Sequence, residues 1–583
     1  MPVPTADILA LRALQATRRL HPPSYVALRY LVETAIGRHD SIWTTSALPR
    51  KFPQRKEARF HSALKFKKLS PEGLTEYREF MVPSPTTALT EAVVLAHLSQ
   101  AQSFAKPTCV YSYLWPQNKE TSPFNFEHYV SGYKARNNAI ANFVGIHPRY
   151  SLIVSDIEKF YPSIRRESVR GRFRTSLENS GAPIEIKETA IQFLEQLFAL
   201  VPGDKGVATG PNLSHVVGDI ALRAIDEALS RQFPGAYFRY VDDIVIAVPE
   251  GNESKALAIL RNLVAAEGLG IQEEKNEVIS GAEWVEHGPH HSAGVKQNSF
   301  EALIFLIKAY LSRHAEGKES LALAFEERGY SIPLERFAAS AKNEHFTSRL
   351  KKLFRRGWWV AIRGFIATEQ DVLRKAESVR GETLASLKLL LRLPMPIGAS
   401  RRKWHVQKLR YLTNRALYLF PDAELQFLVP MLAEYPEFIE TVALLKVLNG
   451  GDLEGLLRLP GAAVSACGGL LSLKGRRFPK LEQLQNITPE IIESLGNLVL
   501  FGVCEIGEKL RQTLDAESRD FLLFCEGIAQ TRRVRQDFSY LDEIRSLQMS
   551  RRPEDKFVMI NNRFSDNEGI VLDALDIGDG YDY

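Results

Sequence analysis

The chain has 583 residues, and its 74 Lys and Arg against 69 Asp and Glu leave a formal net charge of only +5. A chain of this length is expected to hold several domains, and its 45% hydrophobic and 25% charged residues are ordinary for a globular protein. No apolar run of about twenty residues and no signal peptide are visible, which argues against membrane-spanning and secreted proteins.

The cysteines predict a reducing environment. The four of them, Cys109, Cys467, Cys504 and Cys525, are scattered, with no Cys-x-x-Cys pair that would indicate a zinc site. The histidine-rich stretch 287–291 is interpreted as a polar loop.

Residues 1–145 are predicted to be mostly helical, with loops rich in Pro and Ser around residues 83–86 and 115–124. A short apolar run, residues 151–156, follows and ends in Asp156, which predicts a buried strand with an acid at its end. Next comes a Gly-Pro loop that opens an apolar-spaced helix over residues 206–226.

Two β-rich runs then meet at a pair of adjacent carboxylates. Residues 236–248 are dominated by Tyr, Phe, Val and Ile, without Gly or Pro, and predict a tight hairpin with Asp242 and Asp243 at its tip. Two adjacent acids on an apolar hairpin are unfavourable unless cations bind there. If Asp156 meets them in space, the three can hold two Mg²⁺ ions about 4 Å apart for phosphoryl transfer.

From about residue 298 helical periodicity dominates, and strong β runs are nearly absent. Short amphipathic helices between Gly or Pro loops predict an irregular array of helical hairpins. Basic residues cluster with aromatic residues at four places, where they could follow phosphates: residues 351–359, 401–415, 474–478 and 532–535. Solvated helix faces are the alternative interpretation.

The order of these motifs resembles the palm of reverse transcriptases. Residues 156–164 (Asp-Ile-Glu-Lys-Phe-Tyr-Pro-Ser-Ile) are similar to the first catalytic motif, and residues 209–214 (Thr-Gly-Pro-Asn-Leu-Ser) to the motif beside template and nucleotide. Residues 240–243 (Tyr-Val-Asp-Asp) resemble the Tyr-x-Asp-Asp box, and residues 267–278, which include Lys275, are similar to the family's Leu-x-Leu-x-x-x-Lys-Thr-x element.

The resemblance implies an α+β fold with right-hand polymerase fingers and palm, followed by a large all-α, repeat-like domain. The expected divisions are 1–145 for the fingers and N-terminal helical region, 146–297 for the palm, 298–560 for the helical domain, and 561–583 for an acidic, partly disordered tail. The absence of zinc-binding, nuclease and ribonuclease H motifs, with nearly 300 helical residues at the end, makes the chain similar to the bacterial abortive-infection and defence-associated (unknown-group) reverse transcriptases.

Site residues follow from this resemblance. Asp156, Asp242 and Asp243 are the expected catalytic metal ligands, with the main-chain carbonyl of Ile157 as an additional ligand. Tyr161 occupies the position of an aromatic gate that selects dNTPs over NTPs, although a core aromatic beside Phe160 is the alternative. The other expected nucleotide-binding residues are Thr209, Gly210, Lys275, Lys134, Arg136 and Arg78.

The family implies DNA synthesis from dNTPs with two Mg²⁺ ions, for which Mn²⁺ could substitute, in antiphage defence in the bacterial cytoplasm. Synthesis without a template, primed by a tyrosine, is expected, with single-stranded DNA as product, RNA as a further partner, and a homo-oligomer. No membrane partner is expected. The priming residue is unknown, with six open candidates: Tyr25, Tyr30, Tyr111, Tyr113, Tyr581 and Tyr583.

Three alternatives remain open at the level of sequence. One is a template-copying reverse transcriptase of retron or intron type with an RNA partner. Another is a catalytically silent nucleic-acid-binding scaffold, although the intact acid set argues against it. The third is an RNA polymerase, against which the aromatic residue at 161 argues.

Overall fold

The computed structural model describes residues 4, 6–18, 21–28, 60–69, 75–120, 122, 124–127, 129–288, 297–314, 316–334, 367–485 and 487–527. Within these residues the protein is mostly helical, with two antiparallel sheets. None of the described helices has the length and apolar character needed to cross a bilayer. The basic clusters at 351–359 and 532–535 and the expected tail at 561–583 lie outside the described residues.

The larger sheet is built around one central strand. Five strands pair in the order β4-β5-β3-β6, with β7 also pairing with β3. All of the pairings are antiparallel. The strands are β3 (Tyr150–Glu158), β4 (Tyr237–Tyr240), β5 (Asp243–Pro249), β6 (Gly270–Ile271) and β7 (Glu277–Ser280).

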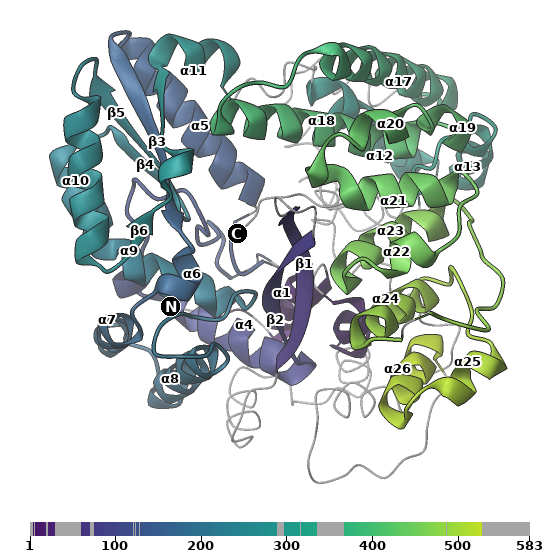
Figure 1. Ribbon diagram of the computed structural model, residues 1–583, viewed down its shortest axis with the longest axis horizontal. Helices are drawn as coiled ribbons and strands as arrows, with labels where there is room; N and C mark the ends of the chain where they lie inside the picture. Colours follow the sequence, from purple (N-terminus) through teal and green to yellow (C-terminus); the bar gives the residue numbers. More distant parts are fainter. Residues whose placement is uncertain are drawn as a thin grey trace.

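The helices described up to residue 288 surround this sheet or lie below it (Figure 1). They are α1 (Ala6–Arg18), α4 (Pro85–Gln100), η2 (Gln102–Phe104), α5 (Tyr129–Ile146), α6 (Phe160–Ser163), α7 (Arg166–Glu178), α8 (Ile184–Ala199), α9 (Asn212–Gln232), α10 (Glu253–Ala266), η3 (Glu273–Lys275) and α11 (Gly281–His287). The strand at 151–156, the helix after the Gly-Pro loop and the tight hairpin are therefore confirmed.

Both faces of the sheet are buried, which explains why its strands are almost continuously apolar. Side chains alternate along each strand, so Leu152 and Val245 face α5 and α11, whereas Ile153 and Ile246 face the core that includes α9 and α10. The sheet is thereby held rigidly at the end where β3 reaches Asp156.

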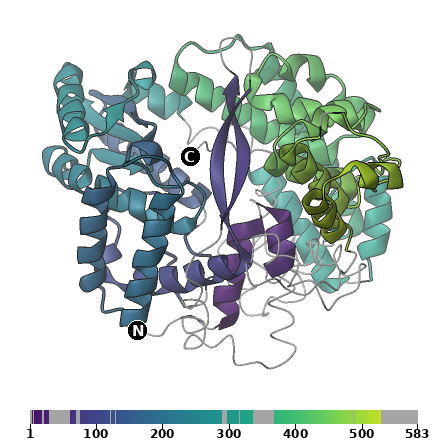
Figure 2. The same cartoon turned by 60° about the horizontal axis from the view of Figure 1, so that its bottom comes forward.

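A second sheet, a two-stranded ribbon, was not predicted. β1 (Phe60–Leu69) and β2 (Thr75–Pro83) pair antiparallel inside the region expected to be mostly helical. The Lys, Glu, Leu and Ala residues of these strands are good helix formers, so local propensity was misleading here. The ribbon lies between the sheet and the C-terminal helices (Figures 1 and 2).

The described residues from 297 to 527 form no named strand, which agrees with the predicted helical character. Their helices are α12 (Gln297–Arg313), α13 (Lys318–Glu326), α17 (Glu369–Arg392), α18 (Ala399–Leu419), α19 (Asp422–Leu425), α20 (Leu428–Leu432), η5 (Pro436–Phe438), α21 (Ile439–Leu448), α22 (Glu454–Leu457), α23 (Gly461–Leu473), α24 (Pro489–Leu500), α25 (Glu508–Thr513) and α26 (Ala516–Glu526).

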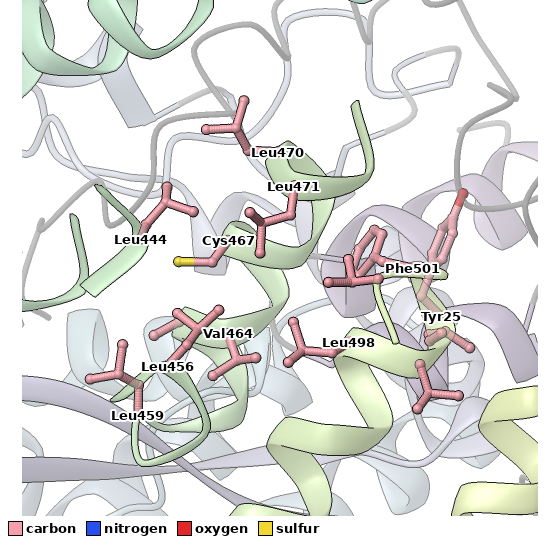
Figure 3. Packing of buried hydrophobic residues seen from close by; sticks show 14 of the residues in the cluster. Tyr25, Leu444, Leu456, Leu459, Val464, Cys467, Leu470, Leu471, Leu498 and Phe501 are labelled. Atoms are coloured by element: carbon pink, nitrogen blue, oxygen red, sulfur yellow. The ribbon is translucent and has the colours of Figure 1, made fainter. Parts of the chain in front are cut away.

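The C-terminal helices share one large core with the beginning of the chain. Within it, Val464 and Cys467 of α23 and Leu498 of α24 belong to the same cluster as Tyr25 (Figure 3). Residues of 9–14 and 25–28 and part of α4 contribute to this cluster as well. The N-terminal region therefore packs against the helical array, a contact that the sequence did not indicate.

Two tryptophans join α18 of this array to α11 beside the sheet. The rings of Trp284 and Trp404 meet edge to face with centroids 5.3 Å apart, and both side chains are buried. A buried aromatic pair in this geometry contributes packing that smaller side chains cannot replace.

We expect Trp404→Ala to destabilise the protein by about 3–5 kcal/mol, because a large buried ring is lost at this junction. Thermal unfolding of the full-length protein measures the effect. Ile397→Ala is the matched control, since Ile397 precedes α18 and is 88% exposed. Equal melting temperatures of the two variants would show that the tryptophan pair does not hold α18 against α11.

Candidate active site

Asp156 lies near the end of β3, directly opposite Asp243 on β5. The preceding residues of β3 alternate between the two cores of the sheet, so the strand cannot slip without exposing apolar side chains. The main-chain N–H of Ile157 donates to the carbonyl of Asp242 at 3.4 Å, which ties the two acidic elements together. The three carboxylates are thus brought to one edge of the sheet.

The hairpin turn is held in an uncommon backbone conformation. Tyr240 pairs with Asp243, so Val241 and Asp242 form a two-residue loop. Val241 has a φ of 55°, a region that β-branched residues rarely adopt. Its N–H donates to Ser112 Oγ at 2.9 Å, and its carbonyl accepts from Arg239 Nη1 at 2.8 Å. These two bonds hold the turn that presents Asp242.

Arg239 is itself fixed by a buried network below the turn. It donates to both oxygens of Asp226 at 2.7 Å, and Tyr237 Oη donates to Asp226 Oδ1 at the same distance. Arg239 also bonds to Asp219, which forms an ion pair with Lys106. Separating the partners of a buried ion pair is strongly destabilising. Because Arg239 belongs to β4, this network resists any displacement of that strand.

Burial and neighbouring charges shift the pKa values of the three carboxyl groups in different directions. Burial, together with the charges of Asp156 and Asp243, raises the pKa of Asp242 to about 8. Burial and Asp243 also raise the pKa of Asp156, against the opposing effect of Lys275. Burial alone would raise the pKa of Asp243, but Lys403, Arg136 and Lys275 outweigh it and lower the pKa. Bound cations would offset the unfavourable burial and repulsion of negative charge at Asp242 and Asp156.

Three basic side chains contact these acids. Lys275 Nζ donates to Asp156 Oδ2 at 2.6 Å, and Lys403 Nζ donates to Asp243 Oδ2 at 2.8 Å. Arg136 is buried, with Nη1 4.0 Å from Asp243 Oδ2 and its guanidinium over the rings of Tyr133 and Tyr240. Lys275 and Arg136 were expected near the nucleotide, and here they lie directly at the acids.

Lys403 was missed as a site residue. It belongs to α18, within the basic cluster 401–415, and comes from a part of the chain 160 residues after Asp243. The cluster was a signal for phosphate binding, but nothing in the sequence indicated which of its members faces the acids. In the cluster at 474–478, Lys474 and Arg476 instead form ion pairs with Asp422.

The three aspartates are suitable ligands for divalent cations, although their carboxylate oxygens do not all lie close together. Carboxylate oxygens are the ligands that Mg²⁺ prefers, and burial together with the charges of Asp156 and Asp243 makes the ionised form of Asp242 unfavourable without a cation. The three aspartates are not among the groups whose donor atoms already lie within 4.8 Å of one another. Lys275 forms an ion pair with Asp156, and Lys403 forms one with Asp243. Cation binding would displace these two contacts.

Tyr161 is buried and packed beside Phe160, at 5% exposure. Its hydroxyl lies 2.7 Å from His215 Nδ1, and the His215 ring stacks on Tyr113 with centroids 3.7 Å apart. Burial lowers the pKa of His215 to about 3, so this imidazole is neutral. Tyr161 is therefore anchored by its hydroxyl, and its role as a gate stays a prediction. The sequence did not point to His215 or Tyr113 as its neighbours.

Thr209 and Gly210 pack against the ribbon. Met81 N–H donates to the Thr209 carbonyl at 2.7 Å, and Thr209 Oγ1 donates to the Glu79 carbonyl at 2.9 Å. Gly210 has a φ of 114°, and a Cβ there would collide with the main chain of Met81. Gly210 therefore allows the main chain to approach β2 closely, in addition to the approach to a substrate that the sequence predicted.

The remaining candidates lie at varying distances from the acids. Arg78 is on β2, half-buried, and close enough to Tyr161 to influence its pKa. Lys134 is on α5 and exposed, without a contact to the acids among the described residues. The Ile157 carbonyl belongs to the strand that pairs with β6, and its role as a ligand stays a prediction.

The candidate priming tyrosines separate into two groups. Tyr25 is buried in the helical core, whereas Tyr111 and Tyr113 are half-buried near the hairpin. Burial, Tyr161, Tyr240 and Asp242 raise the pKa of Tyr113 well above its usual value, so it lies near the acids. Tyr30, Tyr581 and Tyr583 lie outside the described residues.

No protein-family model and no curated protein matches this chain. Among solved structures, telomerase from Candida albicans in complex with a TWJ fragment of telomeric RNA is similar at a TM-score of 0.29. The match has 10% sequence identity and covers 62% of this chain and 67% of that chain. A TM-score this low does not establish a common fold.

We expect Asp242→Asn and Asp243→Asn to change the stability of the metal-free protein in opposite directions. The folded-state pKa of Asp242 is raised from 3.8 to about 8, so the unfolded chain ionises first and stability falls as pH rises through that window. Asp242→Asn removes this penalty, and its advantage grows up to about pH 8. The gain is on the order of a few kcal/mol, because one pKa unit is worth about 1.4 kcal/mol.

Asp243 has a lowered folded-state pKa, so its ionised form stabilises the protein above pH 3.8 and loses this effect in acid. Asp243→Asn should therefore be less stable than the parent at neutral pH, with the difference shrinking below pH 3.8. Chemical denaturation in a chelator between pH 4 and 9 measures the Asp242 effect and its growth with pH. Destabilisation by both variants at pH 8 would contradict the predicted electrostatics.

Proposed function

We propose that this protein is a nucleotidyltransferase of reverse-transcriptase type that synthesises DNA from dNTPs by two-metal catalysis. One observation carries the proposal: Asp156 at the end of β3 meets the Asp242–Asp243 turn at the edge of the sheet, with Arg136 and Lys275 beside them. The raised pKa of Asp242, which burial and the two neighbouring carboxylates cause, supports cation binding at this edge.

Each residue has a defined task in this proposal. Asp156, Asp242 and Asp243 would hold two Mg²⁺ or Mn²⁺ ions, with the Ile157 carbonyl assisting. When bound, the ions supply the charge that stabilises the transferring phosphoryl group. Lys275 and Arg136 orient the triphosphate, with Arg78 and Lys134 further out. Thr209 and Gly210 line the nucleotide pocket beside β2, and Tyr161 forms its floor.

The reaction joins a hydroxyl oxygen to the α-phosphorus of a dNTP. A 3′ or tyrosyl oxygen forms the new O–P bond, the bond to the β-phosphate oxygen breaks, and pyrophosphate leaves. Positioning and charge compensation by the residues around the acids account for the catalysis.

The finer proposal rests on the resemblance of the motifs to the bacterial defence-associated enzymes. It is protein-primed synthesis of single-stranded DNA without a template, by a homo-oligomer in the bacterial cytoplasm, as an antiphage response of the abortive-infection type. The helices between residues 297 and 527 support this interpretation because they stand where another polymerase would carry a thumb and further enzymatic domains.

The first test incubates the purified protein with Mg²⁺ and each labelled dNTP, without template or primer, and analyses the products with and without protease. We expect label that stays on the protein until digestion. Asp156→Asn and Asp242→Asn should lower incorporation by more than about 1,000-fold, as loss of a metal ligand removes transition-state charge stabilisation. Asp204→Asn is the matched control, because Asp204 is an exposed acid in the loop after α8.

The outcomes separate the alternatives. Product formed only with an added RNA template and primer would replace untemplated synthesis by a template-copying enzyme. Absence of product under both conditions, with nucleic-acid binding unchanged in Asp242→Asn, would favour a catalytically silent scaffold. Preferential use of NTPs would indicate an RNA polymerase.

We expect Tyr161→Ala to incorporate NTPs with at least tenfold better relative efficiency, because the ring would no longer block a 2′-hydroxyl. A tenfold change corresponds to about 1.4 kcal/mol in the transition state. Tyr161→Phe keeps the ring but loses the contact with His215, so it should retain dNTP selectivity. Unchanged selectivity in Tyr161→Ala would assign this ring to the core instead.

A further inference from the structure

A second group of ligand-type side chains lies far from the three aspartates in the sequence. His21, His61 and Glu493 come from three separate segments, and their donor atoms all lie within 4.8 Å of one another. Among the described residues this is the one group of three His, Cys, Asp or Glu residues with that property. It was not visible in the sequence, because 432 residues separate His61 from Glu493.

The distances fit a single small cation. His61 Nε2 lies 3.3 Å from Glu493 Oε2, and His21 Nε2 lies 3.7 Å from Glu493 Oε1. Ligands of tetrahedral Zn²⁺, bound at about 2.0–2.2 Å, lie roughly 3.3–3.6 Å apart. The two histidine donors lie within 4.8 Å of each other, so they must approach by at most about 1.5 Å for all three donors to reach one ion.

The surroundings support each ligand. His21 is 1% exposed, so an ion bound to its imidazole would be shielded from solvent on that side. Its Nδ1 lies 2.8 Å from Ser24 Oγ, which can accept the Nδ1 proton when Nε2 binds a metal. The Ser24 N–H also lies 3.3 Å from Nδ1, but it can donate only when Nδ1 carries no proton. Metal binding at Nε2 would therefore replace this longer contact by the shorter bond to Ser24 Oγ.

Glu493 is placed by the packing of α23 against α24. A Cβ at Gly461, the first residue of α23, would collide with the Glu493 carboxylate. Oε1 of Glu493 accepts no hydrogen bond within the described part of the chain, although it is buried. A buried carboxylate oxygen without a donor is unfavourable unless a cation contacts it.

We propose that His21, His61 and Glu493 form a structural site for a divalent transition metal of the zinc class. Two imidazoles and one carboxylate suit Zn²⁺, whereas Mg²⁺ prefers oxygen ligands alone. Three protein ligands leave a fourth position for water, which can enter because the His61 side chain is 30% exposed.

The ion would hold together three parts of the fold. His61 is on β1, Glu493 is on α24, and His21 precedes the helical residues 22–28 that contribute Tyr25 to the core shown in Figure 3. The ribbon β1–β2 in turn contacts Thr209 through Met81. The metal therefore fixes the ribbon against the helical array and, through it, the wall of the candidate nucleotide pocket.

In the test, full-length protein is first stripped of metal with a chelator. It is then titrated with Zn²⁺ in a buffer that contains excess Mg²⁺. We expect one tightly bound equivalent, a raised melting temperature, and with Co²⁺ the intense visible absorption of a four-coordinate site. His61→Gln and Glu493→Gln should weaken binding by more than about 100-fold, since even outer-shell partners cost about 10–100-fold. Gly461→Ala should weaken binding while keeping every ligand.

His314→Gln is the matched control. His314 lies 3.6 Å from Glu316 but has no third ligand within the described residues, so this variant should bind Zn²⁺ like the parent. Failure to bind one equivalent, or equal affinity in His61→Gln and the parent, would overturn the proposal. These readouts do not depend on DNA synthesis, so they remain decisive if the polymerase proposal fails.

Discussion

The crowding of three carboxylates at one edge of a buried sheet is the constraint on which the rest of this structure depends. Burial, together with the charges of Asp156 and Asp243, raises the pKa of Asp242 to about 8, and the basic groups that face these acids come from three distant places. Arg136 belongs to α5, Lys275 to η3 and Lys403 to α18. The electrostatics of the acids therefore link the sheet to the C-terminal helices, because α18 supplies one of the neutralising charges.

Presenting these acids requires backbone strain, which a buried network offsets. Val241 adopts a positive φ at the turn, and Arg239, held by Asp226, bonds to its carbonyl. Placing Asp242 here lowers stability in the absence of cations, as is common where a site is built for function rather than for folding. The same trade-off recurs at Glu493, whose Oε1 is buried and lacks a donor among the described residues.

The ribbon β1–β2 connects the two candidate sites. On one side Met81 bonds to the loop that contains Thr209 and Gly210, and on the other side His61 meets Glu493 of the helical array. A small ribbon is only marginally stable by itself, so it needs such anchors at both sides. The position of the ribbon explains how the proposed ion at His61 would influence the proposed nucleotide pocket beside the sheet.

The sequence by itself determined the local elements: the strand ending in Asp156, the tight hairpin at Asp242 and Asp243, and the helical character after residue 297. These follow from apolar periodicity and turn position, which act over a few residues. Only the tertiary structure decided that Lys403 reaches Asp243, that His21 and His61 meet Glu493, and that residues of 9–14 and 25–28 share the C-terminal core. Those contacts join residues more than 100 positions apart, and they depend on how the elements pack rather than on any local pattern.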